Sequence, residues 1–246
     1  MSVTFIRTAP GGQLPRDAGT GRTPGVGRRL GIAAAVAGAA YTASWAAGLA
    51  LPVPNLAVTA SGADVTARYG GHLTAVQAQF ALTEGLPAIG LAIVAGVLAL
   101  AARRAGARRL SLITIVSGAI AAIISLTQYG LGVALGGAIS PDRDPSAVSS
   151  LFEAVNRLDG AKMLALAVLA AAAAIMAGDG GVLPRWLRYA GGALAVTITI
   201  SGVGYLLLIE ALAPMAYVAG ALLLVFVTGT GVALWRRAAR RVTPEA

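Results

Sequence analysis

The sequence predicts an all-α, polytopic integral membrane protein, a six-transmembrane-helix bundle with a short outer amphipathic helix before the fourth span. Three observations lead to this fold class. The 246 residues are 57% hydrophobic and only 12% charged, with a mean hydropathy of +0.77, whereas a soluble domain carries roughly 25% charged residues. Six apolar runs are long enough, or nearly so, to cross a bilayer. The basic residues lie in groups beside these runs.

The apolar runs define the spans, since a bilayer core requires about 20 apolar residues in a helix. The fourth run is the shortest, because Lys162 and Asp179 bound it. We expect the Lys162 ammonium group to extend outward to the membrane surface and so complete this span. Within a transmembrane domain of residues 30–237, the predicted spans are about 30–51, 80–102, 110–137, 161–178, 189–212 and 215–235.

The distribution of basic residues predicts the orientation. With both termini in the cytoplasm, the inner segments hold fifteen of the 19 Lys and Arg residues and the outer segments hold four. Such an excess on one side is the pattern that sets membrane topology. The preference for Arg over Lys and the abundance of Ala and Gly are typical of a GC-rich bacterial genome. We therefore expect a bacterial plasma (inner) membrane protein with both termini cytoplasmic.

The two ends of the chain differ in composition from the spans. Residues 1–29 are rich in Gly, Pro, Thr and Arg without apolar periodicity, which predicts a disordered, basic cytoplasmic tail. Residues 238–246 form a second cytoplasmic tail. The pair Arg28-Arg29 could begin a twin-arginine export signal. The apolar run after it is too long for such a signal, and no clear cleavage site follows, which favours a simple membrane flank.

Both long outer segments contain helical signals. Asp144 is suited to cap a helix whose first residue is Pro145. Apolar residues then recur at helical spacing and predict an amphipathic helix that runs into span four: Leu151, Phe152, Val155 and Leu158. In the first outer segment, apolar residues from Leu73 onward predict that span two begins early. A helix over 73–102 would be about 45 Å long, so we expect it to tilt, bend or protrude.

Polar side chains within a bilayer are costly and are therefore candidate functional residues. Glu84 is the strongest candidate, because it lies beside Gly85 and shortly before Pro87. Pro87 has no backbone N–H, so the carbonyl of Thr83 lacks its helical partner. Six polar residues share one depth and are predicted to line an outward-facing, ligand-binding vestibule: Glu84, Gln128, Tyr129, Asp159, Tyr205 and Glu210. The alternative is that each acid extends to the interface or pairs with Arg68, Arg157 or Lys162.

Several kinds of chemistry are excluded by missing residue types. The chain has no cysteine and a single histidine, His72, so it cannot form a disulfide, a bis-histidine haem site or a multi-histidine metal site. It has no glycine-rich phosphate loop with lysine. We expect no metal and no cofactor. The net charge of +9 does not predict nucleic-acid binding, because the arginines flank apolar runs. The expected partner is the lipid bilayer.

Two stretches carry a resemblance to a known class. Leu158-Asp159-Gly160-Ala161-Lys162-Met163-Leu164 and Leu183-Pro184-Arg185-Trp186-Leu187-Arg188 resemble small multi-pass (six-helix) bacterial membrane proteins classed as domains of unknown function. The resemblance covers the last three spans. It implies a compact helical membrane domain and brings no activity with it.

Three functions are compatible with these features. The leading hypothesis is a non-enzymatic accessory or small-solute-handling unit with an outward-facing polar pocket, in which Glu84 is the pivotal residue. The first alternative is a permease subunit of a transporter energised by a separate ATPase. The second is an intramembrane acid-base enzyme, such as a lipid or isoprenoid cyclase. In that enzyme Glu84 and Asp159 or Glu210 would be the proton donor and acceptor.

Overall fold

The computed structural model describes residues 24–140, 144–178 and 181–240. Six helical stretches in this part of the chain are long and apolar enough to cross a membrane, as predicted. The six principal helices are α1 (Pro24–Leu49), α4 (Leu86–Arg104), α5 (Arg108–Ala138), α6 (Pro145–Gly178), α7 (Trp186–Leu207) and α8 (Met215–Arg240). Before α4 the chain forms α2 (Gly62–Tyr69), a 3₁₀ turn (Gly70–His72), α3 (Leu73–Phe80) and a π-helical turn (Ala81–Gly85).

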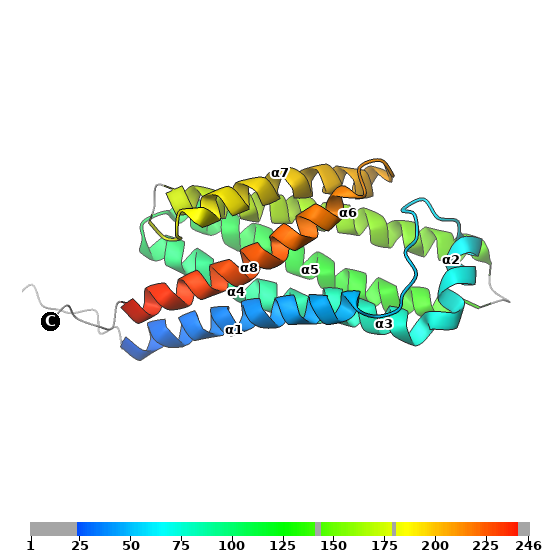
Figure 1. The fold of residues 1–246 in the computed structure, drawn as a ribbon, viewed down its shortest axis with the longest axis horizontal. Helices are drawn as coiled ribbons and strands as arrows, with labels where there is room; N and C mark the ends of the chain where they lie inside the picture. Colours follow the sequence, from blue (N-terminus) through cyan, green and yellow to red (C-terminus); the bar gives the residue numbers. More distant parts are fainter. Residues whose placement is uncertain (1–23, 141–143, 179–180, 241–246) are drawn as a thin grey trace, which may run out of the picture.

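The principal helices form a closed ring. Each of α5 to α8 packs against the helix before it in this series, and α8 returns to pack against α1, which also packs against α4. The helices run roughly along the long axis of the molecule (Figure 1). This arrangement encloses a core, and each principal helix packs against at least two others.

Small residues allow the helices to approach closely. A Cβ atom added at Gly118 of α5 would lie 2.5 Å from the Cβ of Ala95 on α4. A Cβ atom added at Gly160 of α6 would lie 2.6 Å from the carbonyl oxygen of Gly202 on α7. Helix packing in membranes depends on such contacts, because lipid provides no hydrophobic driving force between helices.

The arginine-rich segments lie at one end of the bundle. This arginine end contains the start of α1, the 104–108 turn, residues 181–188 and the end of α8 (Figure 1). Both ends of the described chain therefore lie on the same side of the bundle, as an even number of spans requires. The acidic residues that the structure describes lie in the half of the molecule toward the opposite end.

Residues 51–72 cover that opposite end, and we call them the outer cap because they lie farthest from the arginine end. The cap's helix α2 packs against α6 (Figure 1). The cap has a small hydrophobic core that is separate from that of the main bundle. In this small core Val65 of the cap packs with Leu135 of α5 and with Val148 and Phe152 of α6. The predicted amphipathic helix is present here as the first part of α6. It is continuous with span four, so this helix is 34 residues long.

Three differences between the helix ends and the predicted bounds concern the two tails and the site. Residues 24–29 belong to α1, so the expectation that the disordered tail extends to residue 29 is wrong; residues 1–23 lie outside the described part. Residues 238–240 belong to α8, and residues 241–246 are not described. Helix α7 ends at Leu207, because Leu208 adopts a left-handed conformation with φ 56°. Glu210 therefore lies in the following turn rather than in span five.

Candidate functional site

Three ionisable side chains meet inside the bundle. Lys162 of α6 places its Nζ 2.7 Å from both carboxylate oxygens of Glu84. The same Nζ lies 2.7 Å from Oδ1 of Asp159, one turn earlier on α6. The side chains are 7% exposed for Lys162, 9% for Glu84 and 20% for Asp159. We call this group the ion triad.

Two polar residues of α5 complete the ion triad's surroundings. Ser125 donates a hydrogen bond of 2.5 Å to Oε2 of Glu84. Gln128, one turn later, donates from Nε2 to Oδ1 of Asp159 at 3.3 Å and to the carbonyl of Val155 at 3.2 Å. Oε1 of Gln128 is buried and has no hydrogen-bond partner. The α5 face therefore supplies one donor to each carboxylate and one acceptor that is unused.

The π-helical turn gives Glu84 its position. The N–H of Leu86 donates to the carbonyl of Ala81, five residues earlier, and Pro87 has no N–H to donate. This leaves the carbonyl of Leu82 to accept a 2.6 Å hydrogen bond from the hydroxyl of Ser44 on α1. The sequence indicated an irregularity at this proline, but the carbonyl with a side-chain partner is that of Leu82, not of Thr83. Such π-helical turns are frequent at functional sites.

The depth of the ion triad follows from helix geometry. Glu84 is 19 residues before Arg103, and Lys162 is 16 residues before Gly178. At 1.5 Å per residue these separations are about 28 and 24 Å from the arginine end. A hydrocarbon core is about 30 Å thick. The ion triad therefore lies inside the bundle near the edge of the apolar layer that faces the outer cap.

The formal charges of the ion triad do not balance. Two carboxylates and one ammonium group carry a net charge of −1 when all three are ionised. A single buried charge without compensation is expensive in an apolar interior, and a buried ion pair is stable only when its charges and hydrogen bonds are satisfied. With all three groups ionised, the ion triad therefore carries one negative charge that its own ammonium group does not balance.

Two tyrosines lie on helices that pack against those of the ion triad. Tyr41 of α1 is buried, and α1 packs against α4 and the π-helical turn. Tyr205 of α7 is half-buried, and α7 packs against α6.

The structure corrects the expectation for Lys162. Its ammonium group points into the bundle toward two carboxylates instead of extending outward, and α6 begins at Pro145, so the span needs no extension. The alternative in which Glu84 extends to the interface is also wrong, because Glu84 is buried. Its pairing with Lys162, which that alternative included, takes place inside the protein.

The predicted vestibule residues fall into two groups. Glu84, Gln128 and Asp159 come together, and Tyr205 lies near them. The Tyr129 ring instead packs against Gly85: a Cβ atom added at Gly85 would lie 3.4 Å from Cγ of Tyr129. Tyr129 is 37% exposed. Glu210 is exposed and accepts a hydrogen bond from Thr59 of the outer cap.

Sequence reasoning missed Ser125 and Tyr41, and it missed the inward direction of Lys162. A signal was available in two cases. Ser125 precedes Gln128 by three residues and Asp159 precedes Lys162 by three, a spacing that places both members on one helix face. No sequence signal connects Tyr41 of α1 with these helices.

These observations define the class as a multi-pass α-helical membrane protein with a buried, charge-imbalanced polar centre. The described residues include no group of three or more His, Cys, Asp or Glu side chains that could hold a metal ion. No family model, curated protein or solved structure matches the chain.

Proposed function

We propose that the protein is a non-enzymatic, small-solute-handling unit of the bacterial inner membrane, and that the solute it holds is a proton or a small monovalent cation. The observation that carries the proposal is the ion triad, in which two buried carboxylates share one ammonium group. One bound proton or one monovalent cation makes the charge of this centre zero. Ionisable residues inside membrane proteins typically mark proton relays and ion pathways.

The burial of the ion triad favours the proton. The Glu84 and Lys162 side chains are each less than one-tenth exposed, and a proton needs no additional space. The unpartnered Oε1 of Gln128 offers an acceptor beside Asp159, the more exposed of the two carboxylates. A cation that keeps part of its water would need space beside these buried side chains.

Infrared difference spectroscopy tests the proposal directly. In buffer without small metal cations, the wild type at neutral pH is expected to show the band of a protonated carboxyl group in an apolar environment. Glu84→Gln or Asp159→Asn is expected to remove it. Glu153→Gln is the matched control. Glu153 is an exposed acid on α6, the helix that carries Asp159, and its Oε2 lies 3.7 Å from Nη2 of Arg157. Absence of the band in the wild type, or its persistence in both triad variants, would refute the proposal.

A flux measurement separates proton from cation. The protein is reconstituted in vesicles that contain a pH-sensitive dye, and a potential is applied. We expect the wild type and Glu153→Gln to acidify the vesicles faster than Glu84→Gln does. If sodium removes the protonated-carboxyl band and sodium flux replaces proton flux, the cation is the solute. If neither ion moves faster than through empty vesicles, the ion-handling function is wrong.

The proposed orientation places the arginine end in the cytoplasm. Reporter fusions in the 104–108 turn and after the C-terminus are expected to report the same, cytoplasmic side. Reports from opposite sides would contradict the arrangement of spans as well as the orientation.

The acid-base enzyme is the second candidate, because Glu84 and Asp159 contact the same ammonium group. They, rather than Glu210, would then be the proton donor and acceptor. Accumulation of an apolar precursor in cells that carry Glu84→Gln, with no difference in ion flux, would favour the enzyme. The permease hypothesis is supported only by the number of spans.

A further inference from the structure

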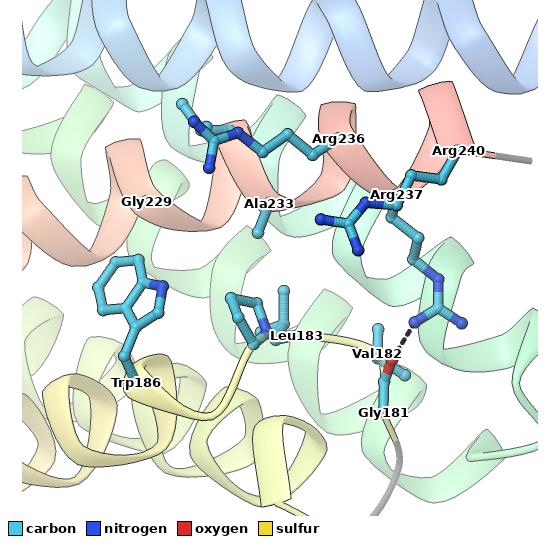
Figure 2. Close-up of a pocket in the computed structure, with 11 residues that line it drawn as sticks. Gly181, Val182, Leu183, Trp186, Gly229, Ala233, Arg236, Arg237 and Arg240 are labelled. Carbon is cyan, nitrogen blue, oxygen red and sulfur yellow. Dashed lines mark hydrogen bonds between the residues drawn. The ribbon is translucent and has the colours of Figure 1, made fainter.

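A second polar site lies at the arginine end, far from the ion triad. A pocket of about 830 Å³ opens between the last turns of α8 and the segment that leads into α7 (Figure 2). Nothing in the proposed ion-handling function uses it. Its lining combines apolar and cationic groups in separate places.

The wall of the pocket is apolar. Trp186 reaches from the start of α7 toward α8, where Gly229 has no side chain (Figure 2). A Cβ atom added at Gly229 would collide with the Trp186 ring. Val232 and Ala233 continue this surface along α8. The ring and the small residues form a surface that suits a hydrocarbon chain.

Arginines supply the polar rim. Arg236, Arg237 and Arg240 project from the last turns of α8 and line the pocket. Arg237 donates a hydrogen bond to the carbonyl of Gly181, which ties the segment before α7 to α8 (Figure 2). Arg236 and Arg240 are exposed. Guanidinium groups are well suited to phosphate, because they offer several N–H donors in one plane.

The pocket also lies at the right depth for a lipid headgroup. The arginines follow the apolar part of α8, whose Trp235 is 41% exposed, and Trp186 is 46% exposed at the start of α7. Exposed tryptophans are typical of the boundary between hydrocarbon and headgroups. Basic pockets between transmembrane helices at this level are known to bind acidic lipid headgroups.

We propose that this pocket binds one anionic phospholipid, with the phosphate between Arg236 and Arg240 and an acyl chain along Trp186, Gly229 and Ala233. The site provides positive charge where the headgroup lies and apolar surface where the chain lies. A lipid bound there would contact both α8 and the segment before α7.

Native mass spectrometry after purification from mixed phosphatidylglycerol and phosphatidylethanolamine membranes tests the proposal. The wild type is expected to retain one phosphatidylglycerol. Arg236→Gln combined with Arg240→Gln is expected to lower this retention by about tenfold or more, since each arginine near a bilayer surface changes affinity for acidic lipid on the order of fivefold. Arg237 is left unchanged because it holds the segment before α7.

Two further variants separate a pocket from general surface charge. Arg103→Gln combined with Arg104→Gln removes the same charge at the same end, outside the pocket, and is expected to retain the lipid. Ala233→Leu leaves the charge unchanged, places a bulkier side chain on the apolar wall where the acyl chain would lie, and is expected to lower retention of the lipid.

Three outcomes would overturn the proposal. The first is equal loss in the Arg236/Arg240 and Arg103/Arg104 variants. The second is unchanged retention in both the Arg236/Arg240 and Ala233→Leu variants. The third is complete displacement of the lipid by excess inorganic phosphate, which would identify a site for free phosphate instead.

Discussion

Replacing Lys162 by methionine tests the physical account of the ion triad. The substitution keeps a long, unbranched side chain and removes the one ammonium group that Glu84 and Asp159 share. Removing one partner of a buried ion pair typically costs about 3–5 kcal/mol, because the remaining charge is left without compensation. With only 9% of the Glu84 side chain exposed, solvent provides little relief. We expect a loss of stability in this range.

Replacing Glu84 by glutamine is expected to have a much smaller effect. The Asp159 and Lys162 charges then balance, and the glutamine keeps the shape of the native side chain and a hydrogen-bonding oxygen. The cost should be near that of one hydrogen bond, about 1 kcal/mol. The same substitution is expected to abolish ion flux. Glu84→Gln should therefore separate function from stability, whereas Lys162→Met should affect both.

The assay is thermal unfolding in one detergent, followed by far-ultraviolet circular dichroism. A difference of about 3–5 kcal/mol corresponds to a midpoint roughly 6–20 °C lower for a chain of this size. Combining Lys162→Met with Glu84→Gln should recover part of the loss, because one unpaired carboxylate is removed. The reasoning is refuted if Lys162→Met leaves the midpoint unchanged, or if Glu84→Gln lowers it by as much.

Two further predictions concern the helices around the site. Gly160→Ala should destabilise the protein by about 1–3 kcal/mol, since the new methyl group would collide with the backbone at Gly202. Gly192→Ala on α7, which has open space around it, should be neutral or stabilising. Equal thermal unfolding midpoints for the two variants would contradict the close packing of α6 against α7. Hydrogen bonds from the Ser146 hydroxyl and N–H hold the pKa of Asp144 below its usual range. The cap that Asp144 forms should therefore be complete above the ordinary Asp pKa and lost as the pH falls through the lowered value. Amide-exchange protection of the first turn of α6 should follow this course, and Asp144→Ala should lack protection at every pH; a pH-independent wild type would contradict it.

Much of the fold could be predicted because lipid imposes a simple rule on sequence. A long, continuous apolar run predicts a helix, since backbone groups in hydrocarbon must pair either within a helix or within a closed barrel. The start of α6 was predictable because Asp144 and Pro145 are a local capping pair. The end of α7 was not, because the left-handed conformation falls on Leu208, where no glycine indicates it.

The site was only partly predictable. The position of a residue within its apolar run indicates its depth in the membrane, but not which neighbouring helix its side chain faces. Glu84, Gln128 and Asp159 were selected by their shared depth, and so were Tyr129 and Glu210. Only the order of helices around the ring decides which of them face one another. The i, i+3 spacing of Asp159 and Lys162 indicates that they share a helix face. It does not indicate that this face meets Glu84, 78 residues away in the sequence.

The π-helical turn has a consequence for how this helix tolerates change. It holds one residue more per turn than regular α-helix. Deleting a single residue between Ala81 and Gly85 would restore regular winding and rotate everything before it by about 100° relative to α4. Helix α3 would then present a different face to α5, and Val65 of the outer cap would leave Leu135 and Phe152. One extra residue in the winding thus couples the position of the buried Glu84 carboxylate to the packing of the outer cap, and a change in this turn would alter both.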